Sequence, residues 1–383
     1  MTLEAGNVIR AVYHVRCDAS RVVELARSIA VEQTVESPDA LIDPEIERRF
    51  VGRLVSIEPL PDGRFAVTLD YPPEAADAPL PQLLNLVYGN VSLLRSVRLA
   101  GLEPCDAVLR SFRGPKFGVE GLRELLGVRG RPLLGAVIKP RGTSAETLAR
   151  MAGDFALGGG DIVKDDHNFV SKGIAHFRRH VTLCQEAVAD ANARTGGNCL
   201  YLCNLSVAAG EIARYVECAL GAGVRGVMVA PLALGLDTVR HIAETYPLVV
   251  LAHPAFSGAL FQDGDHGIDP GILLGTFFRM AGVDITIVPA PGGRLASTHE
   301  ECGRVVGRLR APLGSLRPGW AAPAGGLRLE AIPDAVAEFG EDTVLLFGGA
   351  LLTHGASLER STSVFLDVIR RHARDRATPG NAT

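Results

Sequence analysis

From residue 131 onward the chain alternates short apolar runs with helical stretches, and this alternation restricts the fold more than any other feature. The apolar runs predict buried parallel strands, and the stretches between them predict crossover helices. Eight strands, each followed by a helix, predict an α/β fold. They favour a closed (β/α)8 TIM barrel over an open sheet. The expected strands are 133–138, 161–164, 200–205, 224–230, 248–252, 284–288, 319–323 and 344–347, and the expected helices are 144–157, 177–193, 208–220, 236–245, 270–280, 300–309, 330–339 and 358–374.

The first third of the chain lacks this alternation. Residues 8–15 and 65–69 have the pattern of strands, whereas 21–30 and 81–88 have that of helices. This mixture predicts a small α+β domain of the ferredoxin-like kind. The expected division is an N-terminal domain over residues 1–130, a catalytic barrel over 131–374 and a polar tail over 375–383.

Composition excludes several classes of protein. A net charge of -4 and a pI near 6.2 argue against a nucleic-acid partner or an anionic membrane. The seven cysteines are odd in number and scattered, which indicates reduced core residues. No apolar run is long enough to span a bilayer, and the first ten residues do not form a signal peptide. We therefore expect a soluble cytoplasmic protein.

The chain has only four lysines, and two of them end expected strands. These are Lys139 and Lys164. Arginine stays protonated in proteins, whereas a buried lysine can act as a base or be covalently modified. Lys164 is followed at once by Asp165, Asp166 and His167, which are metal-ligand residue types. The cluster predicts a metalloenzyme; the alternative is a lysine that forms a structural ion pair with a neighbouring aspartate.

Other polar or flexible residues follow the remaining strands, at the barrel end where active sites lie. They are Asn204, His253, the 289–294 loop with Arg294, the pair Gly325–Gly326 and the pair Gly348–Gly349. Glycine pairs after the seventh and eighth strands predict a phosphate site built from backbone N–H groups. His253 is either a substrate contact or a structural histidine, and Arg294 is either an anion clamp or a surface arginine.

These residues, in this order, resemble the large-subunit superfamily of ribulose-bisphosphate carboxylase (RuBisCO). Lys139-Pro-Arg141 resembles the family's Lys-Pro-Lys, and the run from Gly158 to Asn168 resembles its Gly-Gly-x-Asp-x-x-Lys-Asp-Asp-Glu-Asn metal motif. Ala324-Gly-Gly and Phe347-Gly-Gly resemble its Ser-Gly-Gly and Phe-Gly-Gly-Gly, which bind phosphate in relatives. The resemblance covers nearly the whole chain and implies an N-terminal α+β domain before the barrel.

The resemblance also implies roles. Lys164 is expected to carry CO2 as a carbamate and to bind Mg2+, or Mn2+ or Fe2+, together with Asp166 and His167. Lys139 is expected to move a proton at the reacting carbon, with His253 as a further catalytic residue. The expected substrate and phosphate contacts are Arg141, Arg294, Gly325, Gly326, Gly348 and Gly349. Glu32 and Asn90 are expected to complete the active site of a partner subunit, so the smallest assembly is a homodimer.

Departures from the family pattern argue against CO2 fixation. His167 replaces the third metal ligand, a glutamate in carboxylases, and Ile287-Val-Pro289 replaces a His-x-Gly. Arg294 stands where the mobile loop has its lysine, and Arg141 replaces the second lysine of Lys-Pro-Lys. The pattern is that of a RuBisCO-like protein of the non-carboxylating form IV type.

The function expected first is therefore a metal-dependent lyase. It would form an enediolate from a phosphorylated keto sugar acid and decarboxylate a branched 3-keto sugar acid phosphate, of the 3-oxo-isoapionate 4-phosphate type. One alternative is a transcarboxylase/hydrolase acting on the same substrate class. Another is an enolase or isomerase of a (methylthio)sugar phosphate, and the last is a non-catalytic binding protein.

Overall fold

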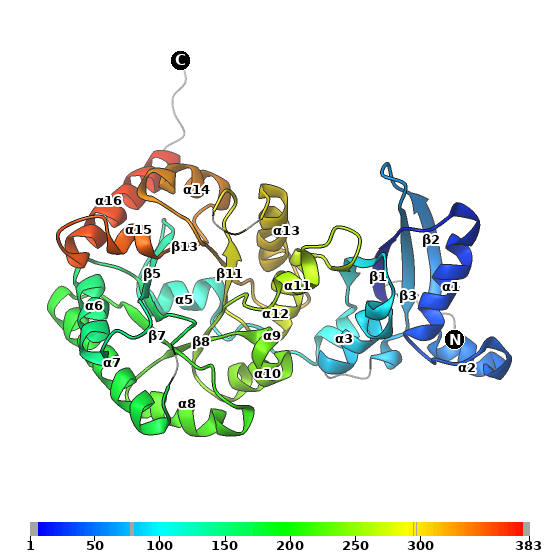
Figure 1. The fold of residues 1–383 in the computed structure, drawn as a ribbon, viewed down its shortest axis with the longest axis horizontal. Coiled ribbons are helices and arrows are strands. Elements are labelled where there is room, and N and C mark those ends of the chain that lie inside the picture. Colours follow the sequence, from blue (N-terminus) through cyan, green and yellow to red (C-terminus); the bar gives the residue numbers. More distant parts are fainter. Residues whose placement is uncertain (1–6, 77–79, 170, 294, 296, 378–383) are drawn as a thin grey trace, which may run out of the picture.

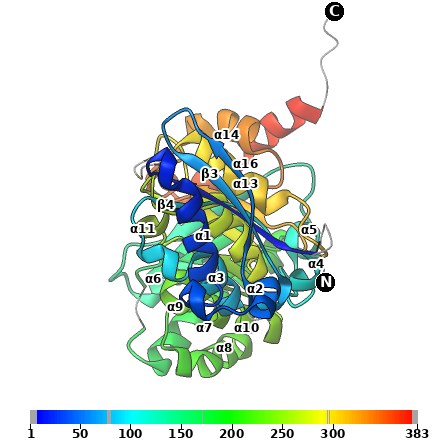
Figure 2. The ribbon, with the colours of Figure 1, turned by 90° about the vertical axis from the view of Figure 1, so that its right-hand side faces the viewer.

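The computed structural model describes residues 7–76, 80–169, 171–293, 295 and 297–377. They form a barrel and, beside it, a smaller domain built around a separate sheet (Figure 1). Turning the molecule shows the smaller domain in front of the barrel, with its helix α1 (Val22–Glu32) facing outward (Figure 2).

Eight parallel strands form the barrel, in the order β12-β11-β9-β8-β7-β6-β5-β13. A parallel bridge between Ala321 and Thr343 joins the two outermost strands and closes the sheet. The predicted TIM-barrel fold is thus confirmed, with each strand within a few residues of its expected place. The strands are β5 (Leu133–Ile138), β6 (Ile162–Asp165), β7 (Leu200–Asn204), β8 (Gly226–Val229), β9 (Val249–Ala252), β11 (Ile285–Pro289), β12 (Trp320–Ala324) and β13 (Val344–Phe347).

Helices surround these strands (Figure 1). Local signals set their ends: the Ser144 hydroxyl, for example, accepts the backbone N–H of Thr147 at 3.2 Å and caps the first crossover helix. Where a single helix was expected over 270–280, the structure has a π-helical turn, Gly271–Phe277, and then α12. The helices of this layer are α6 (Ala145–Leu157), α7 (Ile174–Thr195), α8 (Ile212–Gly221), α9 (Pro231–Leu234), α10 (Leu236–Thr245), α11 (Gly258–Phe261), α12 (Phe278–Met280), α13 (His299–Arg310), α14 (Ile332–Phe339), α15 (Gly349–Leu352) and α16 (Leu358–Ala377).

Strand alternation divides the barrel core into two layers. Inward-facing residues such as Ile162, Met228 and Trp320 pack together in the lumen, whereas outward-facing ones such as Val163 pack under the helices. Helix α5 (Gly118–Leu126) belongs to the inner layer, because its buried apolar side chains pack with those of the lumen. The helix therefore closes one end of the barrel and leaves the other end for chemistry.

The smaller domain is a five-stranded sheet in the order β10-β4-β1-β3-β2. The sequence predicted β1 (Ile9–Val15), β3 (Phe65–Tyr71), α1 and α3 (Leu80–Tyr88), but it did not predict β2 (Arg53–Pro59) or β4 (Val97–Glu103). Short elements complete the domain and its link to the barrel: η1 (Ala19–Arg21), η2 (Asp39–Leu41), α2 (Pro44–Phe50), η3 (Pro73–Ala75), η4 (Asn90–Leu93) and α4 (Asp106–Leu109).

Strand β10 (Gly267–Ile268) comes from the barrel, from the segment that follows β9, and pairs with β4. The loop before β10 includes Asp265, which forms an ion pair with Arg16 at 2.9 Å. Buried Arg98 donates to the carbonyl oxygens of Phe261 and His266 at 3.2 and 3.1 Å. The Asp263–His266 segment, which resembles a metal motif in sequence, is therefore a loop that joins the two parts.

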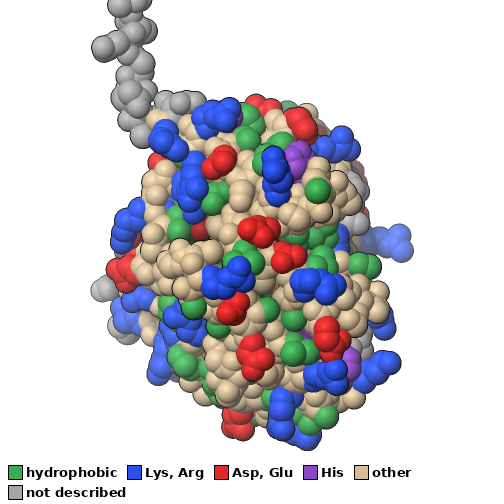
Figure 3. Space-filling model, turned by 90° about the vertical axis from the view of Figure 1, so that its left-hand side faces the viewer, with side chains coloured by type: hydrophobic (Ala, Val, Ile, Leu, Met, Phe, Trp, Pro, Cys, Tyr) green, Lys and Arg blue, Asp and Glu red, His purple; other side chains and the backbone are tan. Residues whose placement is uncertain are grey.

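The remaining global features agree with composition. All seven cysteines are free, and five of them are buried. The face of the barrel opposite the small domain carries basic and acidic side chains intermingled (Figure 3). Across the part of the chain that the structure describes, no helix is long and apolar enough to cross a membrane.

Candidate active site at the carboxyl end of the barrel

Lys164 is a buried lysine in the barrel lumen. It lies two residues after the inward-facing Ile162, and its side chain reaches Met228 of the same inner layer. The Nζ atom donates to the backbone oxygen of Asp165 and to the sulfur of Met228, both at 3.0 Å. Neither acceptor is a carboxylate, and a thioether is a weak acceptor. Burial lowers the pKa of Lys164 to about 8, so an appreciable fraction of the amine is neutral near physiological pH.

Lys139 follows β5, the strand next to β6, and faces the lumen like Lys164. Its positive charge is close enough to contribute to the lowered pKa of Lys164. On the other side, the Lys139 side chain packs against Gly348, which follows β13. The two lysines therefore lie at the same end of neighbouring strands, as the sequence indicated.

Asp166 and His167 lie in the loop after β6. The strand ends at Asp165, so the chain has already turned at His167 and brings its ring to the Asp166 carboxylate, with Nδ1 and Oδ1 3.3 Å apart. The hydrogen bond with His167, supported by the backbone N–H of Asn168, holds the pKa of Asp166 well below its usual range. Asp166 is therefore an anion at any physiological pH.

His253 joins this group from the end of β9. Its ring stacks on that of His167, with centroids 4.1 Å apart and an interplanar angle of 12°. The Nδ1 atom accepts the backbone N–H of Ala255 at 3.1 Å, which leaves the proton of a neutral ring on Nε2. Burial, with Lys164 and His167 nearby, lowers the pKa of His253 to about 3. His253 is thus a neutral imidazole that donates from Nε2.

Lys164 could join Asp166 and His167 as a metal ligand only if its amine were modified. Within the described residues, no three His, Cys, Asp or Glu side chains meet in a metal site. Asp166 and His167 supply one oxygen and one nitrogen, and a carbamate on Lys164 would supply further oxygen. This donor set suits Mg2+ or Mn2+, and Lys164 fits the modification because no carboxylate holds its amine.

Glycine occurs after the last strands of the barrel for different structural reasons. Gly325 and Gly326 follow β12 with φ of +100° and +153°, a region that L residues with side chains rarely adopt. Gly293, in the loop after β11, packs against the backbone of Gly325, and a Cβ there would lie 2.8 Å from its oxygen. Gly349 begins α15, whose first N–H groups have no partners within the helix. The loops after β11, β12 and β13 therefore all have glycine backbone at the carboxyl end of the barrel.

Four predicted site residues remain. Arg141 is exposed in the loop after β5, and Arg294 lies outside the described residues. Glu32 and Asn90, 58 positions apart in the sequence, form a hydrogen bond with each other at 2.9 Å. They lie in the small domain, and α1, which ends at Glu32, is on the side of that domain away from the barrel (Figure 1).

Sequence reasoning missed the residues that support the loop of Asp166 and His167. Asp165, His180 and Tyr201 form a buried polar cluster behind it, and Asn204 contacts the loop directly. Asn204 stood at an expected strand end but received no role. His180 and Tyr201 carry no signal in a single sequence, because a histidine on a helix and a tyrosine in a strand are common core residues.

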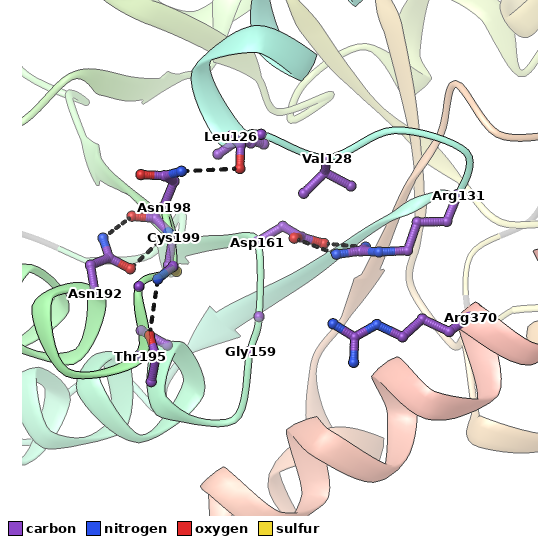
Figure 4. Close-up of a pocket in the computed structure, with 15 residues that line it drawn as sticks. Leu126, Val128, Arg131, Gly159, Asp161, Asn192, Thr195, Asn198, Cys199 and Arg370 are labelled. Carbon is purple, nitrogen blue, oxygen red and sulfur yellow. Dashed lines mark hydrogen bonds and ion pairs between the residues drawn. The ribbon is translucent and has the colours of Figure 1, made fainter.

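A separate cavity of about 300 Å³ lies at the opposite end of the barrel. Asp161 and Cys199, which precede β6 and β7, line it, and Arg370 of α16 points into it (Figure 4). Asp161 is already paired with Arg131 at 2.7 Å. Since the lysines, Asp166 and the histidines lie at the other ends of the same strands, this cavity is not part of the candidate active site.

Comparison with known proteins gives the family. Residues 118–362 match the model of the ribulose bisphosphate carboxylase large chain, catalytic domain. The ribulose bisphosphate carboxylase-like protein 1 of Rhodopseudomonas palustris is 35% identical over 97% of this chain and all of its own. The 5-methylthioribulose-1-phosphate isomerase of Rhodospirillum rubrum is 33% identical, over 94% of this chain and 95% of its own. The 2,3-diketo-5-methylthiopentyl-1-phosphate enolase of Geobacillus thermodenitrificans is 31% identical, over 88% and 86%.

Solved structures agree. A RuBisCO-like protein from R. palustris superposes with a TM-score of 0.85 at 34% identity, covering 98% of this chain and 99% of its own. An octameric RuBisCO from Pyrococcus horikoshii OT3, in complex with sulfate ion, has a TM-score of 0.90 at 28% identity, covering 96% and 89%. The chain belongs to the RuBisCO large-chain family, among its RuBisCO-like proteins.

Proposed function

We propose that the protein is a metal-dependent enzyme that forms an enediolate from a phosphorylated keto sugar and moves a proton on it, as an isomerase or enolase does. The observation that carries the proposal is the grouping of Lys139 and Lys164 with Asp166 and His167 at the carboxyl end of the barrel. This set combines an amine for proton transfer with ligands for a divalent cation. A non-catalytic binding protein has no need of both.

Lys164, as a carbamate, Asp166 and His167 would hold the cation. The neutral form of a buried amine is the one that adds CO2, and the lowered pKa of Lys164 makes that form available. Mg2+ is the first choice, with Mn2+ or Fe2+ favoured by the imidazole of His167. When bound, the cation stabilises negative charge on the substrate oxygens next to the reacting carbon.

Lys139 would be the group that gives or takes the proton. Its charge is close enough to Lys164 to help lower the pKa of that lysine, and Gly348 leaves room for its side chain. The neutral ring of His253 would donate from Nε2 to a substrate hydroxyl or carbonyl oxygen. The proposed phosphate contacts are Arg141, Arg294, and the backbone N–H groups of Gly325, Gly326, Gly348 and Gly349.

The choice of proton transfer rests on the relatives. Proteins named as a methylthioribulose-phosphate isomerase and a diketo-methylthiopentyl-phosphate enolase are 33% and 31% identical to this chain over most of its length. The first name describes the isomerisation of a ketose phosphate, and the second describes an enolase acting on a diketone phosphate.

Decarboxylation of a branched 3-keto sugar acid phosphate is the second candidate. It leads to the same enediolate by loss of CO2, and Lys139 would then protonate the carbon. The specific feature in its favour is His167, which stands where carboxylases have a glutamate as the third metal ligand. The sequence led us to expect this reaction first, but the names of the relatives favour proton transfer over decarboxylation.

A homo-oligomer would complete the site. The described Glu32 and Asn90 are joined to each other and lie in the small domain, where a second subunit could receive them. The similar RuBisCO from P. horikoshii is octameric. We propose residues 1–130 as the part that each subunit presents to its partner and 131–374 as the barrel that receives it.

An isotope experiment tests both candidates. The enzyme, with Mg2+ or Mn2+ and bicarbonate, is incubated in D2O with 5-methylthioribulose 1-phosphate and, separately, with a 13C-carboxyl-labelled phosphorylated 3-keto sugar acid. Deuterium entering the ketose in the wild type, but not in Lys164→Ala, supports proton transfer. Labelled CO2 from the acid supports the lyase instead. If neither signal exceeds that of Lys164→Ala, both proposals fail.

A further inference from the structure

The side chain of Asp165 faces away from the lumen and is 1% exposed. Its Oδ1 atom accepts a hydrogen bond from the Tyr201 hydroxyl at 2.9 Å and lies 2.8 Å from Nε2 of His180. Its Oδ2 atom accepts the backbone N–H of Asn204 at 2.9 Å. Burial raises the pKa of Tyr201 well above its usual range, so its hydroxyl stays a donor. Asp165, at the end of β6, is therefore held by side-chain and backbone groups of two other elements, β7 and α7.

Asn204 links this buried group to the loop after β6 that carries Asp166 and His167. Its Nδ2 atom donates to the backbone oxygens of Phe169 and His167 at 3.1 and 3.2 Å, with that of Asp166 at 3.4 Å. Its Oδ1 atom accepts the Ser206 hydroxyl at 2.8 Å, which fixes the orientation of the amide. A single side chain, 3% exposed, thus holds the backbone of the loop from the side of β7.

Phe169 holds the same loop from the helix side. Its ring stacks on His180, with centroids 4.1 Å apart, and His180 is itself bonded to Asp165. The loop from Asp166 to Phe169 is therefore clamped at both edges. Asp165 is common to both attachments, because it is bonded to the backbone of Asn204 and lies within hydrogen-bond distance of His180.

We propose that Asp165, His180, Tyr201 and Asn204 are positioning residues that hold Asp166 and His167 in the geometry needed for metal binding. This inference rests on the proposed function, because it assumes that those two residues are ligands. Packing alone does not account for the cluster, since a buried carboxylate is costly to desolvate and an apolar side chain would fill the space. Partners behind a metal ligand commonly tune affinity in this way.

The chain offers matched controls. Asp284 is also a fully buried carboxylate that accepts backbone N–H groups, from Phe117, Gly118 and Val250, but it lies at the opposite end of the barrel. Asn192 binds the backbone N–H and oxygen of Cys199 at 2.8 and 2.9 Å, again at the opposite end. Asp165→Asn is therefore compared with Asp284→Asn, and Asn204→Leu with Asn192→Leu.

The first measurement is Mn2+ affinity, from the electron paramagnetic resonance of free Mn2+ in bicarbonate buffer, with thermal denaturation of every variant. Asp165→Asn and Asn204→Leu should bind Mn2+ about 10- to 100-fold more weakly, and Tyr201→Phe less severely. The two controls should bind as the wild type does, whatever their stability. If the site variants lose stability but keep wild-type Mn2+ affinity, the residues are structural only and the inference is wrong.

A second measurement needs no metal. Hydrogen exchange of the metal-free protein should be faster in the 166–169 segment of Asp165→Asn and Asn204→Leu than in the two controls. Unchanged exchange there would overturn the inference, even if the wild type binds no Mn2+. Absence of Mn2+ binding by the wild type, together with faster exchange in the variants, would reject the proposed metal chemistry and leave the positioning of the loop supported.

Discussion

The Nζ atom of Lys139 lies 3.1 Å from the position that a Cβ atom would occupy on Gly348. The two residues follow β5 and β13, the neighbouring strands between which the first and last units of the barrel meet. A Cβ at that distance would be tighter than an ordinary van der Waals contact, so the lack of a side chain on Gly348 provides space for the amine. This relationship gives the glycine after the eighth strand a second role beside the expected contact with phosphate.

Gly348→Ala should therefore slow the reaction without preventing metal binding. The added methyl group displaces the amine of Lys139 by a few tenths of an ångström, and we expect kcat to fall about 10-fold because proton transfer depends on the position of the amine. Gly303→Ala, in α13, is the control, since nothing lies within 4 Å of the added atom. Equal kcat values for the two variants, with Mn2+ affinity unchanged, would show that Lys139 is not constrained in this way.

Lys164→Arg should abolish carbamylation while keeping the positive charge. Arginine has no free amine to add CO2. In 13C-bicarbonate with Mg2+, the wild type should show a carbamate resonance by NMR that this variant lacks. Lys172→Arg, at an exposed lysine, and Lys139→Arg should retain the resonance, although Lys139→Arg should be inactive. A resonance that persists in Lys164→Arg would place the modification elsewhere or exclude it.

The barrel was predictable because its strands are buried on both faces and read as continuous apolar runs. The small domain was only half predictable: β2 is an edge strand with mostly exposed side chains, so its pattern lacks a hydrophobic face. Strand β10 has two residues and pairs with β4, which lies far earlier in the chain, a contact that local sequence does not encode. The same limit applies to the loop that joins barrel and small domain.

At the candidate site, the sequence indicated residue types but not their environment. Lys164 could be singled out because lysine is rare here, and strand alternation directs it inward. That its acceptors are a backbone oxygen and Met228 depends on the neighbouring strands. The cluster of Asp165, His180 and Tyr201 joins residues up to 36 positions apart, and only the closed barrel brings them together.

Glu32 should act in a partner's active site, and mixed oligomers test this. Glu32→Gln damages the small-domain contribution, whereas Lys164→Ala damages the barrel. When the two inactive variants are unfolded together and refolded, half of the dimers are mixed and each has one intact site. Activity should return to about a quarter of that of the wild type. Refolding each variant alone is the control, and a mixture that stays inactive would show that the two residues serve the same subunit.

Asp284 should make stability depend on pH. It is fully buried, and burial raises its pKa from 3.8 to about 6, although backbone N–H groups of Phe117, Gly118 and Val250 oppose the shift. Because the pKa in the folded state is the higher one, the stabilising contribution is complete below about pH 4 and is lost as the pH rises through about 6. The difference corresponds to about 3 kcal/mol.

Asp284→Asn removes this titration, so the free energy of unfolding in urea should be compared at about pH 4 and about pH 7. Relative to the variant, the wild type should lose up to about 3 kcal/mol between the two pH values. Glu124→Gln, which removes an exposed carboxylate of α5, reports the background from surface charge. If wild type and Asp284→Asn change in parallel, the three N–H groups offset the burial of the carboxylate, which then stays charged in the folded protein at both pH values.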